Sequence, residues 1–385
     1  MSKIETINTH KVTLPTRRKH EWASSVGDPI GTHLLVEIRT SDGIVGWGET
    51  TPMATWGGVG GRYDGSTVDA TRNLIDDYLA PRMLGEPVDN IVRLHRTMDS
   101  AVKGNTYAKA AVEMACYDAA GKALGVPVHT LLGGAVRQNV RACHSIGIMA
   151  QDAAIEEGVA AVREGITSLK IKTARNYADD VGIVRGLRAE LGEDVDLRVD
   201  GNEGYPDVAT AVRVTREQEE FGISICEQPL ASDTGLAELR SRVNVGVMAD
   251  ESAWSVSDVA RLNHAGAIDY FSLYVTKAGG LMKAVTSGRF AEAMGLSCDI
   301  GGSVEFGIGN AANLHLAAVL PAANLPSVLP LTAPEGAATT KVAGRYYMDD
   351  IVTQAFRYAD GCLTVPSEPG LGIEVDTDKV RKYSS

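Results

Sequence analysis

A repeat of short apolar strands, each followed by an amphipathic helical stretch, is the feature of this sequence that most restricts its fold. After Pro127, seven such strands end near residues 144, 170, 200, 227, 250, 274 and 299, at spacings of 26, 30, 27, 23, 24 and 25 residues. This rhythm is typical of parallel βαβ units. With an eighth apolar stretch around LPSVLPL, it predicts a closed (β/α) barrel. A doubly wound sheet is less favoured, because no GxGxxG follows the first strand.

The first third of the chain has a different pattern. Residues 1 to about 50 alternate polar and apolar positions around the turn signal Ser41-Asp42-Gly43, and residues 66 to about 125 show helical spacing. The tail is again strand-like. We therefore expect an α+β domain over residues 1–127, a barrel over 128–355 and a C-terminal segment, 356–385, that returns to the first domain.

Composition excludes several partners. Lys and Arg number 37 against 49 Asp and Glu, a formal net charge of −12, which disfavours binding to nucleic acid. The N-terminus lacks the apolar core of a signal peptide, and no apolar run is long enough to span a membrane. The five cysteines include no CxxC pair. We expect a cytoplasmic protein without a membrane partner, and a homo-oligomer.

Three successive strands end in an acidic residue: Asp200 in LRVDGN, Glu227 in ISICEQP and Asp250 in VMADES. Any one of them could simply cap the following helix. Three at matching strand ends of a barrel would converge at the face where barrel active sites lie, and would repel one another without a cation. All-oxygen ligands suit Mg²⁺. Asn202 could add a contact there or serve as a cap.

The preceding strand carries Lys170 and Lys172 in LKIKT, which share one face because strand periodicity is two. Buried lysines require opposing negative charge, which the neighbouring carboxylates and a substrate anion would supply. Burial and mutual repulsion are expected to lower a lysine pKa toward that of a general base. The alternative is a pair of solvated lysines at a strand end.

Together these motifs resemble the enolase superfamily, in particular its muconate-lactonizing-enzyme subgroup, which is grouped with mandelate racemase. The resemblance covers nearly the whole chain and rests on segments in family order: AVEMACYDAAGKALGVPVHTLLGG (111–134), KIK (170–172), DGN (200–202), EQP (227–229), DES (250–252), KAGG (277–280) and PGLGIEVD (369–376). It implies an α+β capping domain on a modified TIM barrel of the (β/α)7β type.

The resemblance also implies a chemistry, which is inherited from the family rather than worked out from spacing. Asp200, Glu227 and Asp250 would bind Mg²⁺, which would hold the carboxylate of a small-molecule substrate and stabilise an enediolate. Lys172 would act as base or acid on one face of the substrate. Lys170 would lie behind it and touch the carboxylate.

One departure from the family pattern bears on the reaction. The subgroup normally carries a second lysine on the sixth barrel strand, but alignment of KAGG in IDYFSLYVTKAGG places Tyr274 at that position and Lys277 three residues later. A phenol, with a reference pKa near 10, donates a proton more readily than it removes one from carbon. Reversible proton transfer needs two competent faces, whereas elimination or cycloisomerisation needs one base.

Substrate contacts are predicted at five positions. Asp299 and Glu305 could pair with a cationic nitrogen, although structural capping is an equal alternative. Trp22 and Trp56, with His20, Glu21 and Met53 nearby, would come from capping-domain loops, and an aromatic beside acids suits an ammonium group. Asn202 completes the set. His315 is expected to pack inside a helix, and the role of His144 stays open.

Three functions follow. The first is an Mg²⁺-dependent lyase that dehydrates a small hydroxy or amino acid such as cis-3-hydroxy-L-proline. The second, in the same fold, is a racemase or epimerase of an amino acid or proline betaine, or a cycloisomerase. The third is a catalytically silent binding barrel that has lost the lysine of the sixth strand.

Overall fold

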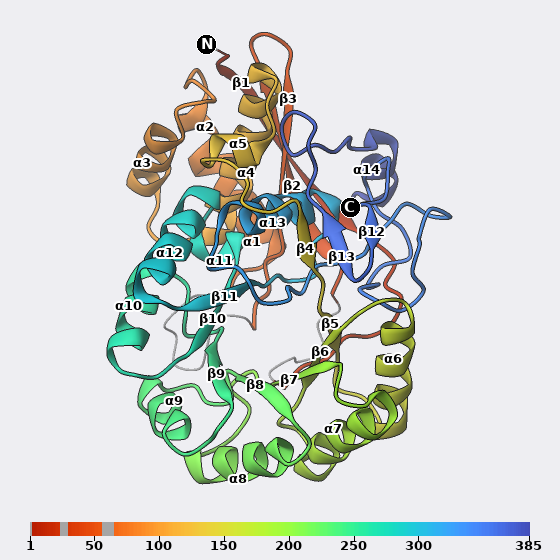
Figure 1. Ribbon diagram of the computed structural model, residues 1–385. Coiled ribbons are helices and arrows are strands. Elements are labelled where there is room, and N and C mark those ends of the chain that lie inside the picture. The colour runs from red at the N-terminus through yellow and green to blue at the C-terminus, as the bar shows by residue number, and fades with distance from the viewer. Residues whose placement is uncertain (1, 24–29, 56–64) are drawn as a thin grey trace.

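The N-terminal part of the chain forms an antiparallel sheet covered by helices (Figure 1). The computed structural model describes residues 2–23, 30–55 and 65–385. Strands β1 (Ile4–Thr13), β2 (Thr32–Thr40) and β3 (Val45–Thr50) lie in the order β1-β2-β3, and the predicted turn at Gly43 joins the last two. The helical segments that follow are α1 (Val68–Leu74), the π-helical η1 (Ile75–Leu79), α2 (Ala80–Met83), α3 (Ile91–Ala101), α4 (Thr106–Leu124) and α5 (Val128–Leu131).

The long helix α4 packs against β3 at a distance that only glycine allows. A Cβ added to Gly48 would lie 2.0 Å from the carbonyl oxygen of Ala111, and one added to Gly46 would lie 2.2 Å from that of Ala115. Nearly every residue of α4 from Tyr107 to Gly121 is buried. A helix buried on all sides has no polar stripe, so α4 acts as the central packing element of the capping domain.

The barrel is a seven-stranded parallel sheet that curls on itself, with helices on its outside (Figure 1). Its strands, in spatial order, are β5 (His144–Ile146), β6 (Ser168–Lys172), β7 (Asp196–Asp200), β8 (Ile223–Glu227), β9 (Gly246–Ala249), β10 (Tyr270–Leu273) and β11 (Ser297–Ile300). The helices between and after them are α6 (Gln151–Arg163), α7 (Tyr177–Leu191), α8 (Val208–Glu219), α9 (Asp233–Arg240), α10 (Val256–His264), α11 (Val275–Ala278), α12 (Leu281–Met294) and α13 (Gly307–Val319). All seven strands lie where the repeat predicted them.

The eighth apolar stretch does not form a strand, which corrects that part of the prediction. Its backbone nevertheless bridges the two edges of the sheet: Cys143 N donates to Ser327 O (2.7 Å), and Leu325 N donates to Cys298 O (3.3 Å). Pro326 and Pro330 lack an N–H, so this segment cannot sustain a ladder of hydrogen bonds. Isolated contacts close the barrel in place of a strand.

The C-terminal segment lies against both parts of the molecule. Strands β12 (Tyr358–Ala359) and β13 (Cys362–Thr364) form a small sheet with β4 (Asn139–Arg141), which precedes the barrel. Further along, Leu371 N donates to Asp118 Oδ1 of α4 (2.8 Å). After α14 (Thr377–Tyr383), Ser385 N donates to Lys11 O of β1 (3.0 Å).

Two buried glutamates of the capping domain bind the N-termini of barrel helices. Glu49 of β3 accepts hydrogen bonds from Phe306 N and Gly309 N at the start of α13, each at 2.7 Å. Its Oε1 also contacts His33 Nδ1 at 2.8 Å. Glu113 of α4 likewise accepts hydrogen bonds from backbone N–H groups at the start of α12. A carboxylate on the free N–H groups of a helix start satisfies them and complements the helix dipole, so these contacts fix the capping domain on the barrel.

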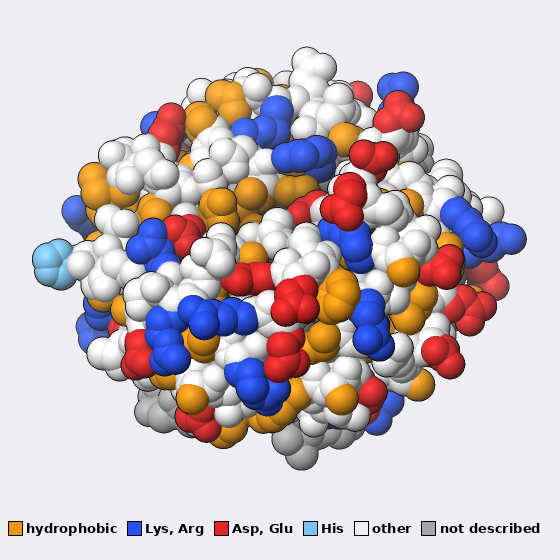
Figure 2. Space-filling view, turned by 60° about the horizontal axis from the view of Figure 1, so that its bottom comes forward, with side chains coloured by type: hydrophobic (Ala, Val, Ile, Leu, Met, Phe, Trp, Pro, Cys, Tyr) orange, Lys and Arg blue, Asp and Glu red, His pale blue; other side chains and the backbone are white. Residues whose placement is uncertain are grey.

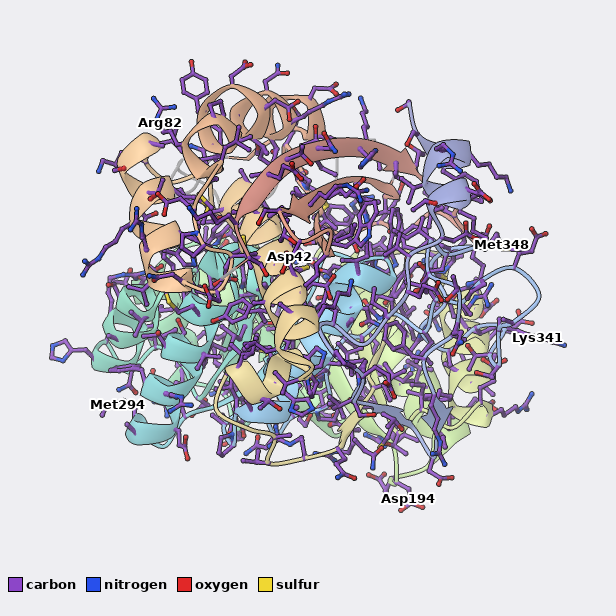
Figure 3. The ribbon with its side chains drawn as sticks, turned by 90° about the horizontal axis from the view of Figure 1, so that it is seen from above. Asp42, Arg82, Asp194, Met294, Lys341 and Met348 are labelled. Carbon is purple, nitrogen blue, oxygen red and sulfur yellow. The ribbon has the colours of Figure 1, made fainter. Side chains whose placement is uncertain are left out.

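The surface carries charges of both signs. On the face shown in Figure 2, Lys and Arg side chains are interspersed with Asp and Glu, without one dominant patch. Figure 3 shows Arg82, Met294 and Lys341 pointing outward at the periphery. Among the described residues, no helix combines the length and apolar character needed to cross a bilayer.

The Glu49 contact can be tested by Glu49→Gln. A glutamine retains one acceptor oxygen but loses the charge and one of the two helix-start partners, so the free energy of unfolding should fall by about 2 kcal/mol. Urea titration followed by circular dichroism measures it, with Glu5→Gln, an exposed position on β1, as the control. A Glu49→Gln variant as stable as the control would contradict this role.

Candidate active site

Three carboxylates meet at the carboxyl ends of neighbouring barrel strands. Asp200 ends β7 and Glu227 ends β8, and the two are direct partners in the parallel register. Asp250 follows β9 at once. All three have no solvent-exposed surface. The convergence predicted from the three strand ends is therefore present in the fold.

A glutamine that the sequence reasoning missed shapes this end of the barrel. Gln228, next to Glu227, has a positive φ of 32° and accepts hydrogen bonds at Oε1 from Asp250 N (2.8 Å) and Ser252 N (3.2 Å). Its Nε2 donates to Ser252 Oγ (2.7 Å). The side chain thus ties the loop that carries Asp250 to the end of β8. Its position in the EQP motif was the sequence signal that could have identified it.

Three lysines neutralise these carboxylates: Lys170 and Lys277 are buried, and Lys172 is partly exposed. Lys170 Nζ lies 2.8 Å from Glu227 Oε1 and 3.4 Å from Asp200 Oδ2. Lys172 Nζ donates to Asp200 Oδ2 (2.7 Å) and to Asn202 Oδ1 (2.9 Å). Lys277 Nζ donates to Asp250 Oδ1 (2.5 Å) and to two backbone carbonyls. Each acid therefore has an ammonium partner.

The electrostatics of this cluster differ from one expectation. Burial lowers the pKa of Lys170, but Glu227, Asp200 and other carboxylates raise it, and the balance lies well above the usual value. The lowered pKa expected of buried paired lysines is thus wrong for Lys170 in this arrangement, because each lysine faces an acid. Burial, followed by repulsion from Asp200, raises the pKa of Glu227 to about 8.

The residues fit a divalent cation. Within residues 2–23, 30–55 and 65–385, no group of three His, Cys, Asp or Glu side chains stands ready to hold an ion, and each of the three carboxylates is paired with a lysine. Glu227 Oε2, however, is buried without a hydrogen-bond partner. An unpaired carboxylate oxygen beside two further carboxylates is an all-oxygen donor set of the kind that Mg²⁺ takes. Asp200, Glu227 and Asp250 would be its ligands.

Tyr274, and not Lys277, faces the cavity above these groups. It follows β10, and its hydroxyl donates to Asp250 Oδ2 (3.1 Å). Lys277 lies behind Asp250, with its Nζ 4.1 Å from the centre of the Tyr274 ring. Burial and the surrounding carboxylates hold the pKa of Tyr274 well above its usual value. A protonated phenol therefore lines the same cavity as Lys172.

A small cavity of about 50 Å³ lies over the lysines and extends beneath the capping domain. Among the described residues its lining consists of His20, Trp22, Ile30, Met53, Ser145, Lys170, Lys172, Tyr274, Gly302, Ser303, Val304, Val328 and Tyr346. Trp22, Ile30, Met53 and Ser303 also line a larger chamber of about 280 Å³ between this cavity and β2. The capping domain thus forms the roof of the candidate site.

The remaining predicted residues divide into two groups. Asn202 is part of the cluster: besides Lys172, it contacts buried Glu251 through Nδ2 (2.8 Å). Trp22 lines the cavity, and its contact with substrate stays a prediction. Trp56 lies outside the described residues, so the structure says nothing about it.

Two predicted acidic contacts are not brought to the cavity. Asp299 is held inside the barrel by Arg198 Nη1 (3.3 Å) and Ser272 Oγ (2.7 Å), because the guanidinium of Arg198 is itself fully buried and needs a counter-charge. Glu305 lies behind the lining segment, where its Oε1 accepts from Ser303 N (3.0 Å) and burial raises its pKa to about 7. The alternative of a structural role fits both positions.

Two histidines are structural. His144 Nδ1 accepts from Gly344 N (3.0 Å), and Nε2 contacts Glu157 Oε1 (3.0 Å). His315 is buried in α13, as expected, with Nε2 bonded to Leu371 O (3.1 Å). Neither ring lines the described cavity.

Comparison with known proteins identifies the class. Residues 153–379 match the family described as enolase C-terminal domain-like, and residues 15–133 match the mandelate racemase / muconate lactonizing enzyme N-terminal domain. The chain therefore belongs to the enolase superfamily, in the muconate-lactonizing-enzyme subgroup. Enzymes of this group depend on Mg²⁺, and those that the chain matches act on small carboxylates.

Individual relatives cover the whole chain. It is 33% identical to muconate cycloisomerase 1 of Pseudomonas putida (100% of this chain, 98% of the relative) and 28% identical to an N-succinyl-L-Arg/Lys racemase of Bacillus cereus (99% and 98%). The solved structure of 2-chloromuconate cycloisomerase from Rhodococcus opacus 1CP superposes with a TM-score of 0.89 at 29% identity, covering 100% of both chains. The matched relatives include both cycloisomerases and a racemase.

Removal of Lys277 tests the charge balance of the site. Lys277→Met would leave Asp250 buried without its ammonium partner, and the free energy of unfolding measured without metal should fall by about 3–5 kcal/mol. Lys283→Met is the control, because Lys283 pairs with Asp99 at the partly exposed surface and such pairs contribute about 1 kcal/mol or less. Equal losses in the two variants would contradict the neutralising role of Lys277.

Metal binding can be tested without activity. Mg²⁺ that binds the folded state should raise the melting temperature, by an amount equivalent to about 2.7 kcal/mol at a hundredfold excess over its dissociation constant. Glu227→Gln should abolish most of this shift. Glu305→Gln changes another buried carboxyl outside the cluster and should retain it. A full Mg²⁺ shift in Glu227→Gln would exclude Glu227 as a ligand.

Proposed function

We propose that this enzyme removes the α-proton of a small carboxylate in an Mg²⁺-dependent reaction and then eliminates a β-hydroxyl as water. The observation that carries the proposal is the presence of both Lys172 and Tyr274 in the lining of the cavity. Burial and the surrounding carboxylates keep the phenol of Tyr274 protonated by raising its pKa, which leaves the amine of Lys172 as the base of the two. Hydroxy acids and hydroxy amino acids, such as cis-3-hydroxy-L-proline, are the substrates of this class.

The proposal assigns roles to the chain's own side chains. Asp200, Glu227 and Asp250 would hold Mg²⁺, which supplies positive charge to bind the substrate carboxylate and stabilise the charge that develops on it. Lys172, oriented by Asn202, takes the α-proton. Lys170 supports the bound carboxylate. Tyr274 contributes an O–H that donates to the substrate or shapes the wall.

Tyr274 favours elimination over racemisation. A racemase must deliver and remove a proton on both faces of the same carbon, and a phenol with an ordinary pKa near 10 serves poorly as the base in one of the two directions. Elimination requires only one base and a path for the leaving group. The described lining also contains no carboxylate to pair with an ammonium group, which favours hydroxy acids within the class.

Cycloisomerisation is the second candidate, since it too requires one proton-transferring group, and muconate cycloisomerases are among the relatives that the chain matches. Epimerisation of an amino acid or proline betaine remains the third. Trp22 in the roof supports it, because an aromatic face binds a quaternary ammonium. A catalytically silent barrel is disfavoured, since the relatives are enzymes and Lys170 and Lys172 are in place.

Two further expectations, a cytoplasmic location and assembly into a homo-oligomer, remain proposals. The five cysteines are free, and Cys116, Cys143, Cys226 and Cys298 are buried. Unpaired thiols are consistent with a reducing cytoplasm. Size-exclusion chromatography with light scattering would show whether the chain assembles into a homo-oligomer.

Incubation in D₂O with Mg²⁺ and a panel of hydroxyprolines, betaines, sugar acids and muconate separates these functions. Loss of water supports the lyase, ring closure the cycloisomerase, and deuterium incorporation with inversion the epimerase. Lys172→Ala should lower α-proton exchange by at least about 10²-fold, while Tyr274→Phe should leave exchange largely intact. Exchange that survives in Lys172→Ala would refute this assignment of the base.

A further inference from the structure

One wall of the cavity carries uncharged polar groups without protein partners. Ser145 Oγ and Tyr346 hydroxyl are buried, with side chains 2% and 3% exposed, and neither makes a hydrogen bond within the described structure. His20 lines the same cavity, and its ring lies edge-on to Tyr346 with centroids 5.4 Å apart. Buried polar atoms normally have partners, so two unpartnered hydroxyls beside a histidine that lines the same cavity indicate a binding subsite.

The tautomer of His20 follows from its neighbour. Arg18 Nη1 lies 3.1 Å from His20 Nδ1, and because a guanidinium can only donate, Nδ1 must accept. A neutral ring therefore carries its proton on Nε2. No described group bonds to that nitrogen, and the ring lines the cavity. His20 thus presents an N–H donor to the cavity.

Arg18 holds this wall in place. Its guanidinium is bound by Glu157, through Nε at 3.0 Å and through Nη2, and it also donates to Ser145 O (3.4 Å) and Lys19 O (2.9 Å). Glu157 is in turn bonded to His144. One arginine thereby orients both His20 and the backbone of Ser145. Burial, with the positive charges of Arg18 and Lys172 nearby, keeps the pKa of His20 well below its usual value, so the ring stays neutral.

We propose that His20, Ser145 and Tyr346 form a subsite for the hydroxyl group that leaves the substrate. The subsite offers hydrogen bonds but no charge, which suits a neutral oxygen rather than a second carboxylate. It rests on the proposed elimination and adds the group that binds the departing oxygen.

The elimination balances without another reactant. The Cα–H bond breaks and its proton moves to Lys172 Nζ, while the electron pair forms the Cα=Cβ double bond and the Cβ–O bond breaks. Hydroxide takes the proton back from Lys172 and leaves as water. The Nε2–H of His20 donates a hydrogen bond to the departing oxygen throughout and is not transferred, so His20 acts as a neutral donor.

Matched substrates test this subsite. We would measure α-deuterium exchange in D₂O and water loss with two pairs, cis-3-hydroxy-L-proline with L-proline, and D-gluconate with 3-deoxy-D-gluconate, for the wild type, His20→Ala and Tyr346→Phe. We expect dehydration to fall by about 10²-fold in His20→Ala and by about 10-fold in Tyr346→Phe. Exchange with the compound that lacks the hydroxyl should stay near the wild-type rate in both.

Controls separate this role from a structural one. His144→Gln alters the same Glu157 network outside the cavity and should not discriminate between the members of a pair, whereas His20→Gln retains an N–H donor and should recover part of the dehydration. Equal losses on both members of a pair in His20→Ala, or no loss on the hydroxylated one, would overturn the subsite while leaving the proposed function intact.

A second measurement does not depend on activity. Nitrogen-15 NMR of histidine-labelled protein, with the His20 signals assigned by comparison with His20→Gln, should show the proton on Nε2 from pH 6 to 8. A proton on Nδ1 would overturn the subsite. If the wild type neither exchanges nor dehydrates any compound of the panel, the proposed function fails, and the leaving-group role of His20 fails with it.

Discussion

Neutralisation of buried charge is the constraint on which the rest of this structure depends. Asp200, Glu227 and Asp250 have no exposed surface at the mouth of the barrel, and removing carboxylates from water is costly unless each meets a positive charge. Lys170, Lys172 and Lys277 supply that charge from β6 and from the short helix α11. The same carboxylates would hold a cation, and Lys170 and Lys172 would then be available to face a substrate anion.

The capping domain depends on the same kind of interaction. Glu49 and Glu113 place carboxylates on the exposed N–H groups at the starts of α13 and α12, and a buried histidine, His33 or His95, contacts each of them. These contacts hold Trp22 and Met53 above the cavity. The shape of the roof is thereby linked to interdomain packing, because Trp22 and Met53 belong to the capping domain that these contacts fix on the barrel.

Membership in the enolase superfamily bears on the fold and the shared chemistry, whereas the departure at Tyr274 bears on which reaction follows. The family, visible over the whole chain at 33% identity to a muconate cycloisomerase, defines the fold and the carboxylate chemistry. The replacement of a second lysine by a phenol concerns the outcome of the reaction, because it removes one of two bases. His20 and its neighbours add a neutral wall, which relates to the leaving group rather than to proton abstraction.

The sequence by itself determined the barrel, its strand ends and the convergence of three acids at those ends, because strand periodicity and the spacing of βαβ units are local properties of the chain. Only the tertiary structure decided what Asp299, Glu305 and His20 contact. A residue next to a strand end can point into the cavity or behind it, and the difference depends on partners far away in the sequence. Arg198 draws Asp299 into the barrel interior, and Arg18 orients His20 toward the cavity. The segment around Pro326 closes the barrel without forming a strand for a similar reason, because its hydrogen bonds depend on the two sheet edges that only folding brings together.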